Sequence, residues 1–166
     1  MSVLNFIDPD HRVVITTCAG ELTLVDIATS ATELCDAPNF KPDFLQLLDL
    51  SQVTSIKVDH AGLYQLQSAY DPFSNKGRRA VVAPQENTAQ IARVYRTLVS
   101  SSNFEVFGTL LEAIAWLGLE VQILEAAVKR ENSTMRTRST NSEIAPKDDV
   151  PGTFRPFRRK GKGSGG

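Results

Sequence analysis

One apolar run, residues 44–50, constrains the fold of this chain more than any other feature. Five of its seven residues are large and apolar, and only Gln46 and Asp49 interrupt it. A strand that is covered on both faces has this pattern, and such strands are usually parallel and central in a sheet. Residues 51–57 are mixed and polar, which predicts a loop at the carboxyl end of the strand.

The next segment, residues 59–70, predicts a helix. Asp59 suits the N-cap position, because its carboxylate can accept hydrogen bonds from the free N–H groups of the first turn. Leu63, Leu66 and Tyr70 recur at a spacing that places them on one apolar face. Asp71 ends the helix, since the residue before a proline avoids the α region.

The rest of the domain alternates between strands and helices. Residues 3–7 and 12–19 predict an antiparallel hairpin that Gly20 ends, because so short a connection excludes a parallel pair. Thr23 and Asp26 then form a capping-box pair at the start of a helix. Further elements are expected in the order strand, helix, strand, helix at residues 79–83, 86–99, 103–107 and 109–118. The predicted fold class is α/β: a mostly parallel sheet of about five strands, with an N-terminal antiparallel hairpin and four to five helices.

Two further segments follow residue 118. Residues 119–130 fit both a strand and a helix by spacing, and their composition favours a helix. Its apolar face would cover the domain's own sheet or, in the alternative, form a homodimer contact. Residues 131–166 contain almost no large apolar residues, so a disordered basic tail is predicted there. The expected division is a domain at 1–118, an extra C-terminal helix at 119–130 and a tail at 131–166.

Two motifs around the central strand resemble those of STAS domains. Asp49-Leu50-Ser51 ends the strand and Asp59-His60-Ala61-Gly62-Leu63 opens the helix. This pattern is similar to that of the anti-sigma factor antagonists and of the broad SpoIIAA-like (STAS/Sec14-like) group of bacterial proteins. The resemblance spans residues 3–118 and implies the same α/β fold, with a partner contact in the loop before the helix and in its first turn. The partner it implies is a protein, typically a kinase-like anti-sigma factor, and the contact residues are Ser55, Lys57, Asp59, His60, Ala61 and Gly62.

One departure from the family pattern concerns regulation. The antagonists are phosphorylated on a serine in Asp-Ser-Ser-Gly, and the two serine positions are His60 and Ala61 here. Neither residue has a hydroxyl, so this chain cannot add phosphate charge at that helix start. Constitutive binding of a regulatory partner is therefore expected rather than a phosphoswitch. The alternative is modification of Ser51, Thr54 or Ser55, which precede the helix and have hydroxyls.

Charge is divided unevenly along the chain. The net charge is −1, but residues 1–128 carry 8 Lys and Arg against 15 Asp and Glu, whereas residues 129–166 carry 10 against 4. An acidic domain argues against general nucleic-acid binding by the folded part. The tail ends in a basic and aromatic cluster that could contact nucleic acid or an anionic membrane, or could only aid solubility. Its charged residues are Arg155, Arg158, Arg159, Lys160 and Lys162.

Few residues suggest catalysis. His11 and His60, the only histidines, lie in different segments, and Cys18 and Cys35 show no metal-ligand spacing. We therefore expect no enzyme, no metal site and no cofactor. The main basic group of the domain predicts a solvated surface, with an anion or lipid-headgroup site as the alternative. Its members are Lys76, Arg78, Arg79, Arg93 and Arg96.

A cytoplasmic protein with reduced thiols fits the sequence best. No signal peptide is recognisable, and no apolar stretch is long enough for a membrane span. The alternative function is a small-molecule or lipid carrier, which the Sec14-like part of the resemblance implies. Against it, no helix carries surplus apolar residues that would line a cavity.

Overall fold

A computed structural model describes residues 2–143 of the chain, with side chains described as far as residue 133. The chain divides into two compact units, Met1–Glu131 and Asn132–Gly166. The described strands all belong to the first unit, and only the last part of helix α5 belongs to the second.

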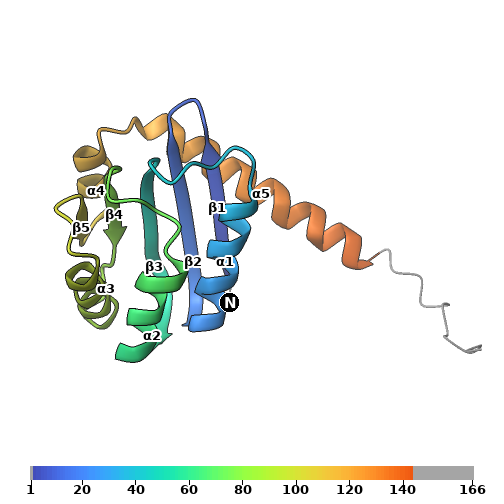
Figure 1. Cartoon of the computed structure of the whole chain (residues 1–166). Helices are drawn as coiled ribbons and strands as arrows, with labels where there is room; N and C mark the ends of the chain where they lie inside the picture. The colour runs from blue at the N-terminus through green and yellow to red at the C-terminus, as the bar shows by residue number, and fades with distance from the viewer. Residues whose placement is uncertain (1, 144–166) are drawn as a thin grey trace, which may run out of the picture. The chain divides into compact units, whose positions relative to one another are not determined.

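The first unit is built on a five-stranded sheet whose spatial order follows the chain (Figure 1). The first two strands pair antiparallel, and the three remaining pairs are parallel. The predicted α/β fold with an N-terminal hairpin is therefore confirmed. The strands are β1 (Ser2–Asp8), β2 (Val13–Thr23), β3 (Leu45–Lys57), β4 (Arg79–Val82) and β5 (Phe104–Phe107).

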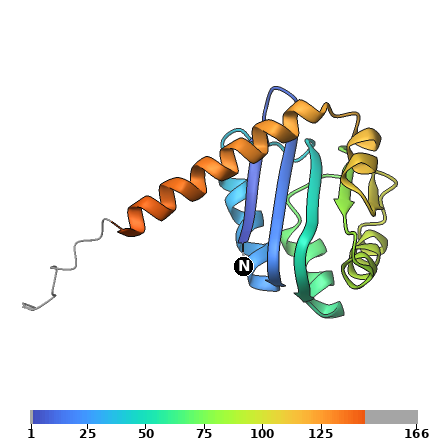
Figure 2. The ribbon, with the colours of Figure 1, turned by 180° about the vertical axis from the view of Figure 1, so that it is seen from behind.

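Helices cover both faces of this sheet (Figures 1 and 2). The first four helical segments lie on one face, and α4 lies on the other with the first turns of α5. Parallel strands require such crossover helices, which bury both faces of the sheet. The helices are α1 (Leu24–Asp36), α2 (His60–Gln65), the π-helix η1 (Leu66–Tyr70), α3 (Glu86–Val99), α4 (Leu110–Leu117) and α5 (Val121–Glu143).

Alternate strand residues fill two core layers. On the first face Leu50 and Val81 pack with Ala92 of α3. On the opposite face Leu47 packs in the cluster that contains Ala113 of α4. This alternation explains why residues 45–50 of β3 are almost continuously apolar, since both faces of this part of the strand are covered.

Two helix starts follow the sequence prediction. Thr23 and Asp26 form the capping box at the start of α1. Thr109 caps α4 and accepts a hydrogen bond from the Glu112 N–H at 3.3 Å. Each side chain satisfies an N–H group that has no partner within its helix.

Two strands are longer than predicted. β2 continues past Gly20 to Thr23 through register shifts, and Gly20 adopts a φ of 79°, which glycine tolerates in a bulge. β3 continues to Lys57, so residues 51–57 are strand and the predicted loop is wrong. These residues pair only with β2, because β4 has only four residues. A two-stranded extension of β2 and β3 therefore projects past the carboxyl end of β4 (Figure 1).

The last helix also differs from the prediction. α5 runs to Glu143, so residues 131–143, expected to be disordered, are helical. No proline or glycine stands between residues 119 and 145, so no helix-breaking residue interrupts it. Within the first unit, Ile123 and Ala127 are buried against the domain's own sheet, which is the first of the two predicted alternatives. The predicted tail contacts Arg155, Arg158, Arg159, Lys160 and Lys162 lie outside the described residues.

Candidate functional site

The predicted partner residues meet at the tip of the β2–β3 extension, where α2 begins (Figure 1). Asp59 caps the helix, because its Oδ1 accepts a hydrogen bond from the Gly62 N–H at 2.8 Å. His60 and Ala61 form the exposed first turn. Gly62 is buried, and a Cβ added there would lie only 2.8 Å from Val58 Cγ1. The turn therefore presents His60 and Ala61 outward, while Asp59 and Gly62 fix its position.

Ser55 and Lys57 share one acidic neighbour on the extension. Ser55 Oγ donates a hydrogen bond to Glu21 Oε2 at 3.1 Å, and Lys57 Nζ lies 4.0 Å from the same oxygen. An exposed ion pair of this kind contributes at most about 1 kcal/mol. A binding partner could therefore replace these contacts at little cost.

Two exposed hydrophobic side chains lie beside this helix start. Val25 of α1 is 71% exposed and Tyr64 of α2 is 63% exposed. The first turns of α1 and α2 are neighbours, because a Cβ added at Gly62 would lie 3.8 Å from Leu24 Cδ2. We define the tip surface as Val25, Lys57, His60, Ala61 and Tyr64.

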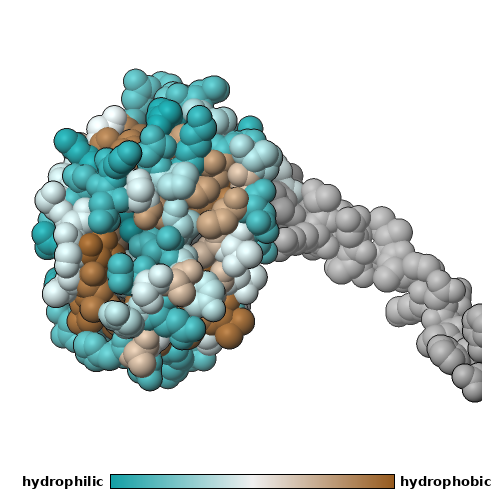
Figure 3. Space-filling model, in the orientation of Figure 1, coloured by the Kyte–Doolittle hydropathy of each residue, from teal (hydrophilic) through white to brown (hydrophobic). Residues whose placement is uncertain are grey.

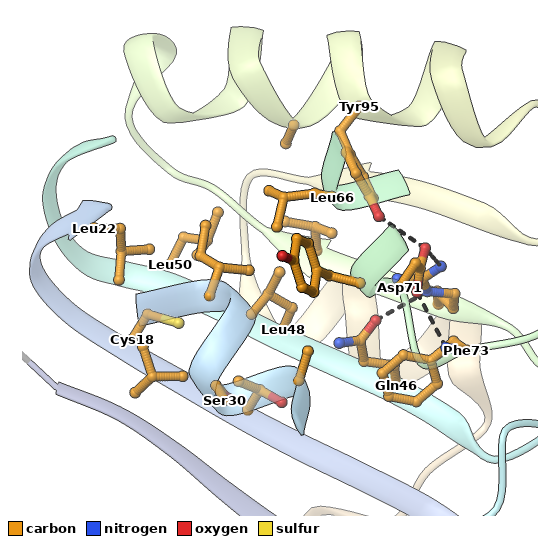
Figure 4. A pocket seen from close by; sticks show the side chains of 18 of the residues that line it. Cys18, Leu22, Ser30, Gln46, Leu48, Leu50, Leu66, Asp71, Phe73 and Tyr95 are labelled. Carbon is orange, nitrogen blue, oxygen red and sulfur yellow. Dashed lines mark hydrogen bonds and ion pairs between the residues drawn. The ribbon is translucent and has the colours of Figure 1, made fainter. Parts of the chain in front are cut away.

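A cavity lies between the sheet and helices α1, η1 and α3 (Figure 4). Its volume is about 150 Å³, and its walls are mainly apolar. The expectation that the helices have no residues to line a cavity is therefore wrong: Ile27, Leu66 and Ile91 face it from three helical segments, opposite Leu48 and Leu50 of β3. Hydrophobic atoms are visible between hydrophilic side chains on this face of the molecule (Figure 3).

Arg79 is the centre of a buried polar cluster in the cavity wall (Figure 4). Its Nη1 lies 2.7 Å from Asp71 Oδ2, and its Nε donates to Gln46 Oε1 at 2.9 Å. Tyr95 donates its hydroxyl proton to the same Asp71 oxygen at 2.8 Å. The expectation that Arg79 belongs to a solvated basic surface is wrong, because β4 is covered on both faces and the side chain is buried.

The other arginines of that basic group each have a separate contact. Arg78 donates to the Trp116 carbonyl at 2.9 Å, and its guanidinium lies over the Trp116 ring. Two more arginines form surface ion pairs, Arg93–Glu86 and Arg96–Glu105. Among these described residues, the arginines do not converge on one anion site.

A second polar group lines the cavity near β1. Thr16 Oγ1 donates to Asn5 Oδ1 at 2.8 Å, and Asn5 Nδ2 donates to Ser30 Oγ at 2.8 Å. Asn5 and Thr16 are cross-strand neighbours, and Ser30 comes from the overlying α1. This chain of hydrogen bonds ties α1 to the sheet.

Burial raises the pKa of two groups in the cavity wall. The pKa of Tyr95 lies well above its usual range, because of its burial first and the Asp71 charge second. Burial, with a further contribution from the Asp49 charge, raises the pKa of the Cys18 thiol to about 12. Both side chains are neutral at neutral pH, so Cys18 is a poor nucleophile there.

The two histidines lie at opposite ends of the sheet. His11, in the β1–β2 turn, lies 2.8 Å from Asp8, whereas His60 lies at the tip. In the part of the chain that the structure describes, no group of three His, Cys, Asp or Glu residues could hold a metal. None of the helices described there has both the length and the apolarity needed to cross a membrane.

The sequence interpretation missed the roles of Gln46, Asp71 and Tyr95. Gln46 interrupts an otherwise apolar strand, and a buried amide of this kind needs a hydrogen-bond partner. A polar residue within the apolar strand was therefore the sequence signal that could have indicated a buried polar cluster. Asp71 was interpreted only as the end of a helix, and Tyr95 only as part of an apolar face.

Comparison with known proteins gives similarity at the level of fold. The chain is similar to solved structures with a SpoIIAA-like fold. One is an uncharacterised protein of the DUF3478 family from Shewanella loihica, at 20% identity over 70% of this chain and 92% of that chain, with a TM-score of 0.48. An anti-sigma factor antagonist from Mycobacterium paratuberculosis is 20% identical over 70% and 94%, with a TM-score of 0.47.

A third similar structure is the anti-sigma factor antagonist SpoIIAA in its unphosphorylated form. It is 12% identical over 70% of this chain and 97% of that chain, with a TM-score of 0.44. No family model matches the chain, and no curated protein matches it.

Proposed function

We propose that this domain is a non-catalytic protein-interaction module of a bacterial regulatory pathway, similar in role to an anti-sigma factor antagonist. The tip surface is the proposed contact. The observation that supports it is the exposure of Val25 and Tyr64 beside the exposed first turn of α2. Aromatic side chains are enriched in protein interfaces, where they supply much of the binding energy.

The polar groups of the extension suit the rim of such a contact. Lys57 and Glu21 lie at the edge of the tip surface and are both exposed. Charged rim residues mainly set the rate of association and the choice of partner, whereas apolar groups at the centre hold the complex together. We therefore place Tyr64 and Ala61 at the centre of the proposed contact and Lys57 at its edge.

The proposed interaction does not depend on phosphorylation at the start of α2. His60 and Ala61 occupy the first turn and have no hydroxyl. Ser55 lies in β3 rather than in a loop, and its hydroxyl already donates to Glu21. Binding through the tip surface is accordingly constitutive.

Native mass spectrometry of the full-length protein, purified gently from its own cells, tests this function. We expect a complex with a second protein, and we expect Ala61→Arg to lower the bound fraction about tenfold or more. Leu111→Arg is the matched control: Leu111 is the second residue of α4, as Ala61 is of α2, and it is 72% exposed. If both variants bind equally well, the tip surface is not the contact.

A second candidate function, binding of a small apolar molecule, is favoured by the cavity. A cavity of about 150 Å³ with mainly apolar walls is large enough for a ligand of the size of a benzene derivative. The two functions are compatible. The cavity lies between the sheet and the inner sides of α1 and η1, whereas the tip surface consists of exposed side chains on the exterior of the domain.

A further inference from the structure

We propose that the cavity selects an uncharged, mainly apolar small molecule that has a carbonyl or ether oxygen, and that the Gln46 amide nitrogen recognises this oxygen. The inference rests on the second candidate function. It adds the chemical class of the ligand and the residue that recognises the ligand.

The amide group of Gln46 is only half satisfied. Its Oε1 accepts from Arg79 Nε at 2.9 Å, and Gln46 is 8% exposed. Arg79 can only donate, so the oxygen must face it and the nitrogen must point the other way. Figure 4 shows that nitrogen turned away from Asp71, toward the cavity side of the cluster. It has no hydrogen-bond partner among the described residues, and it is not closed off from the cavity.

Ser30 adds a second donor from the α1 side of the cavity. Its Oγ accepts from Asn5 Nδ2, and it is buried to the same extent as Gln46. Its hydroxyl proton has no acceptor within the described part of the chain. Both donors face a mainly apolar cavity and have no acceptor among the described residues, so a ligand that supplies an acceptor is favoured over a pure hydrocarbon, which would cover them without pairing them.

The charges of the cavity wall favour an uncharged ligand. Arg79 and Asp71 neutralise each other at 2.7 Å, and Tyr95 donates to Asp71. Lys76 and the other described arginines of the basic group are exposed at the surface, away from this wall. A carboxylate in the cavity would have to displace Asp71 from Arg79, or lie unpaired in an apolar environment, which is costly.

The ligand is expected to touch Leu48, the next apolar residue of β3 on the same face as Gln46. In the parallel register Val14, Gln46, Arg79 and Phe104 form one row across the sheet. Leu48, two residues on, faces the same side and lines the cavity. An apolar body over Leu48 with its oxygen toward Gln46 fits this arrangement.

Three probes of similar size test the inference: acetophenone, its hydrocarbon analogue α-methylstyrene, and benzoate. Binding is followed on the full-length protein by ¹H–¹⁵N spectra, with the Gln46 side-chain amide assigned by its absence in Gln46→Met. We expect both neutral probes to shift signals of cavity residues. Only acetophenone should shift the Gln46 amide, and benzoate should bind more weakly than acetophenone.

Two variants separate recognition from folding. Gln46→Glu keeps an oxygen for Arg79 Nε and removes the donor, and Gln46→Met removes both groups. We expect each to weaken acetophenone about five- to tenfold, and we expect Gln46→Met to change the affinity for α-methylstyrene by less than about twofold. The response of the wild-type amide is measured on the wild-type protein, so it does not depend on the affinity of either variant, and either folded variant suffices to assign the signal.

The outcomes are distinguishable. If neither neutral probe binds, the small-molecule function fails and the inference fails with it. If both bind but the Gln46 amide does not respond, the cavity function stands and recognition by Gln46 is overturned. Tighter binding of benzoate than of acetophenone would overturn the preference for an uncharged ligand.

Discussion

Arg79 and Asp71 form an ion pair of 2.7 Å inside the domain, and their side chains are only 7% and 9% exposed. The guanidinium also lies 4.9 Å from the centre of the Phe73 ring and 5.2 Å from that of Phe104. Asp71 directly follows η1, and Arg79 opens β4, so the pair joins the helical cover of the cavity to the sheet beneath it.

Removal of one member of this pair should destabilise the domain strongly. Asp71→Ala leaves the Arg79 charge buried without its counter-charge, which typically costs about 3–5 kcal/mol. We expect this loss in the free energy of unfolding from urea titration. Arg93→Ala breaks an exposed pair with Glu86 and serves as the control, with an expected loss below about 1 kcal/mol. Equal losses in the two variants would show that the buried pair has no special role.

Tyr95 should make the stability of the domain depend on alkaline pH. Burial and the Asp71 charge raise the pKa of Tyr95 above the unfolded value of 10.0. The unfolded chain therefore loses this proton first, so the stabilisation is complete below pH 10 and is lost as the pH rises toward the folded pKa. Urea titrations between pH 9 and 11 should show a shallower decline for Tyr95→Phe, by at most about 1.4 kcal/mol per pH unit. Identical slopes for the two proteins would contradict the account.

The two thiols should differ in reactivity. Cys35 is exposed, whereas Cys18 is buried and has its pKa raised to about 12. With a disulfide reagent at pH 8 we expect one thiol to react at once and the second only as the chain unfolds, because the thiolate is the reactive form. Cys35→Ser should remove the fast phase completely. A fast phase that persists in this variant would mean that Cys18 is accessible.

Gly77 should tolerate no side chain. A Cβ there would lie 2.5 Å from the Phe44 carbonyl oxygen and 2.7 Å from that of Asp43, and backbone atoms cannot move aside cheaply. We expect Gly77→Ala to lower the free energy of unfolding by about 1–3 kcal/mol. Gly108→Ala is the matched control, because nothing lies within 4 Å of its added Cβ. Equal stability of the two variants would contradict the close approach.

Local sequence patterns predicted most of the fold. The caps Thr23, Asp59 and Thr109 act within a few residues of the chain, and the apolar run at residues 44–50 is one continuous segment, so both can be read directly. The ends of β2 and β3 could not be read in this way. Gly20 signals a strand end but here occupies a bulge, and the polar residues 51–57 are strand only because β2 pairs with them.

The candidate site was only partly predictable, for the same reason. The turn at Asp59, His60 and Ala61 is one continuous segment, so a sequence motif can locate it. The cavity instead depends on residues that are distant in sequence, such as Gln46 and Tyr95, and on a π-helix that continues α2. No local pattern in the chain indicated that Asp71, at the end of that π-helix, would form an ion pair with Arg79.

Site-specific photo-crosslinking in cells tests the central claim, that the tip surface contacts a protein partner, most directly. A photoreactive benzoylphenylalanine is placed at Ala61 in one variant and at Leu111 in the other, since both positions are exposed and both are second in their helices. We predict a covalent complex with one discrete protein from position 61 and none from position 111. A complex formed from position 111 alone, or from neither position, would contradict the proposed function.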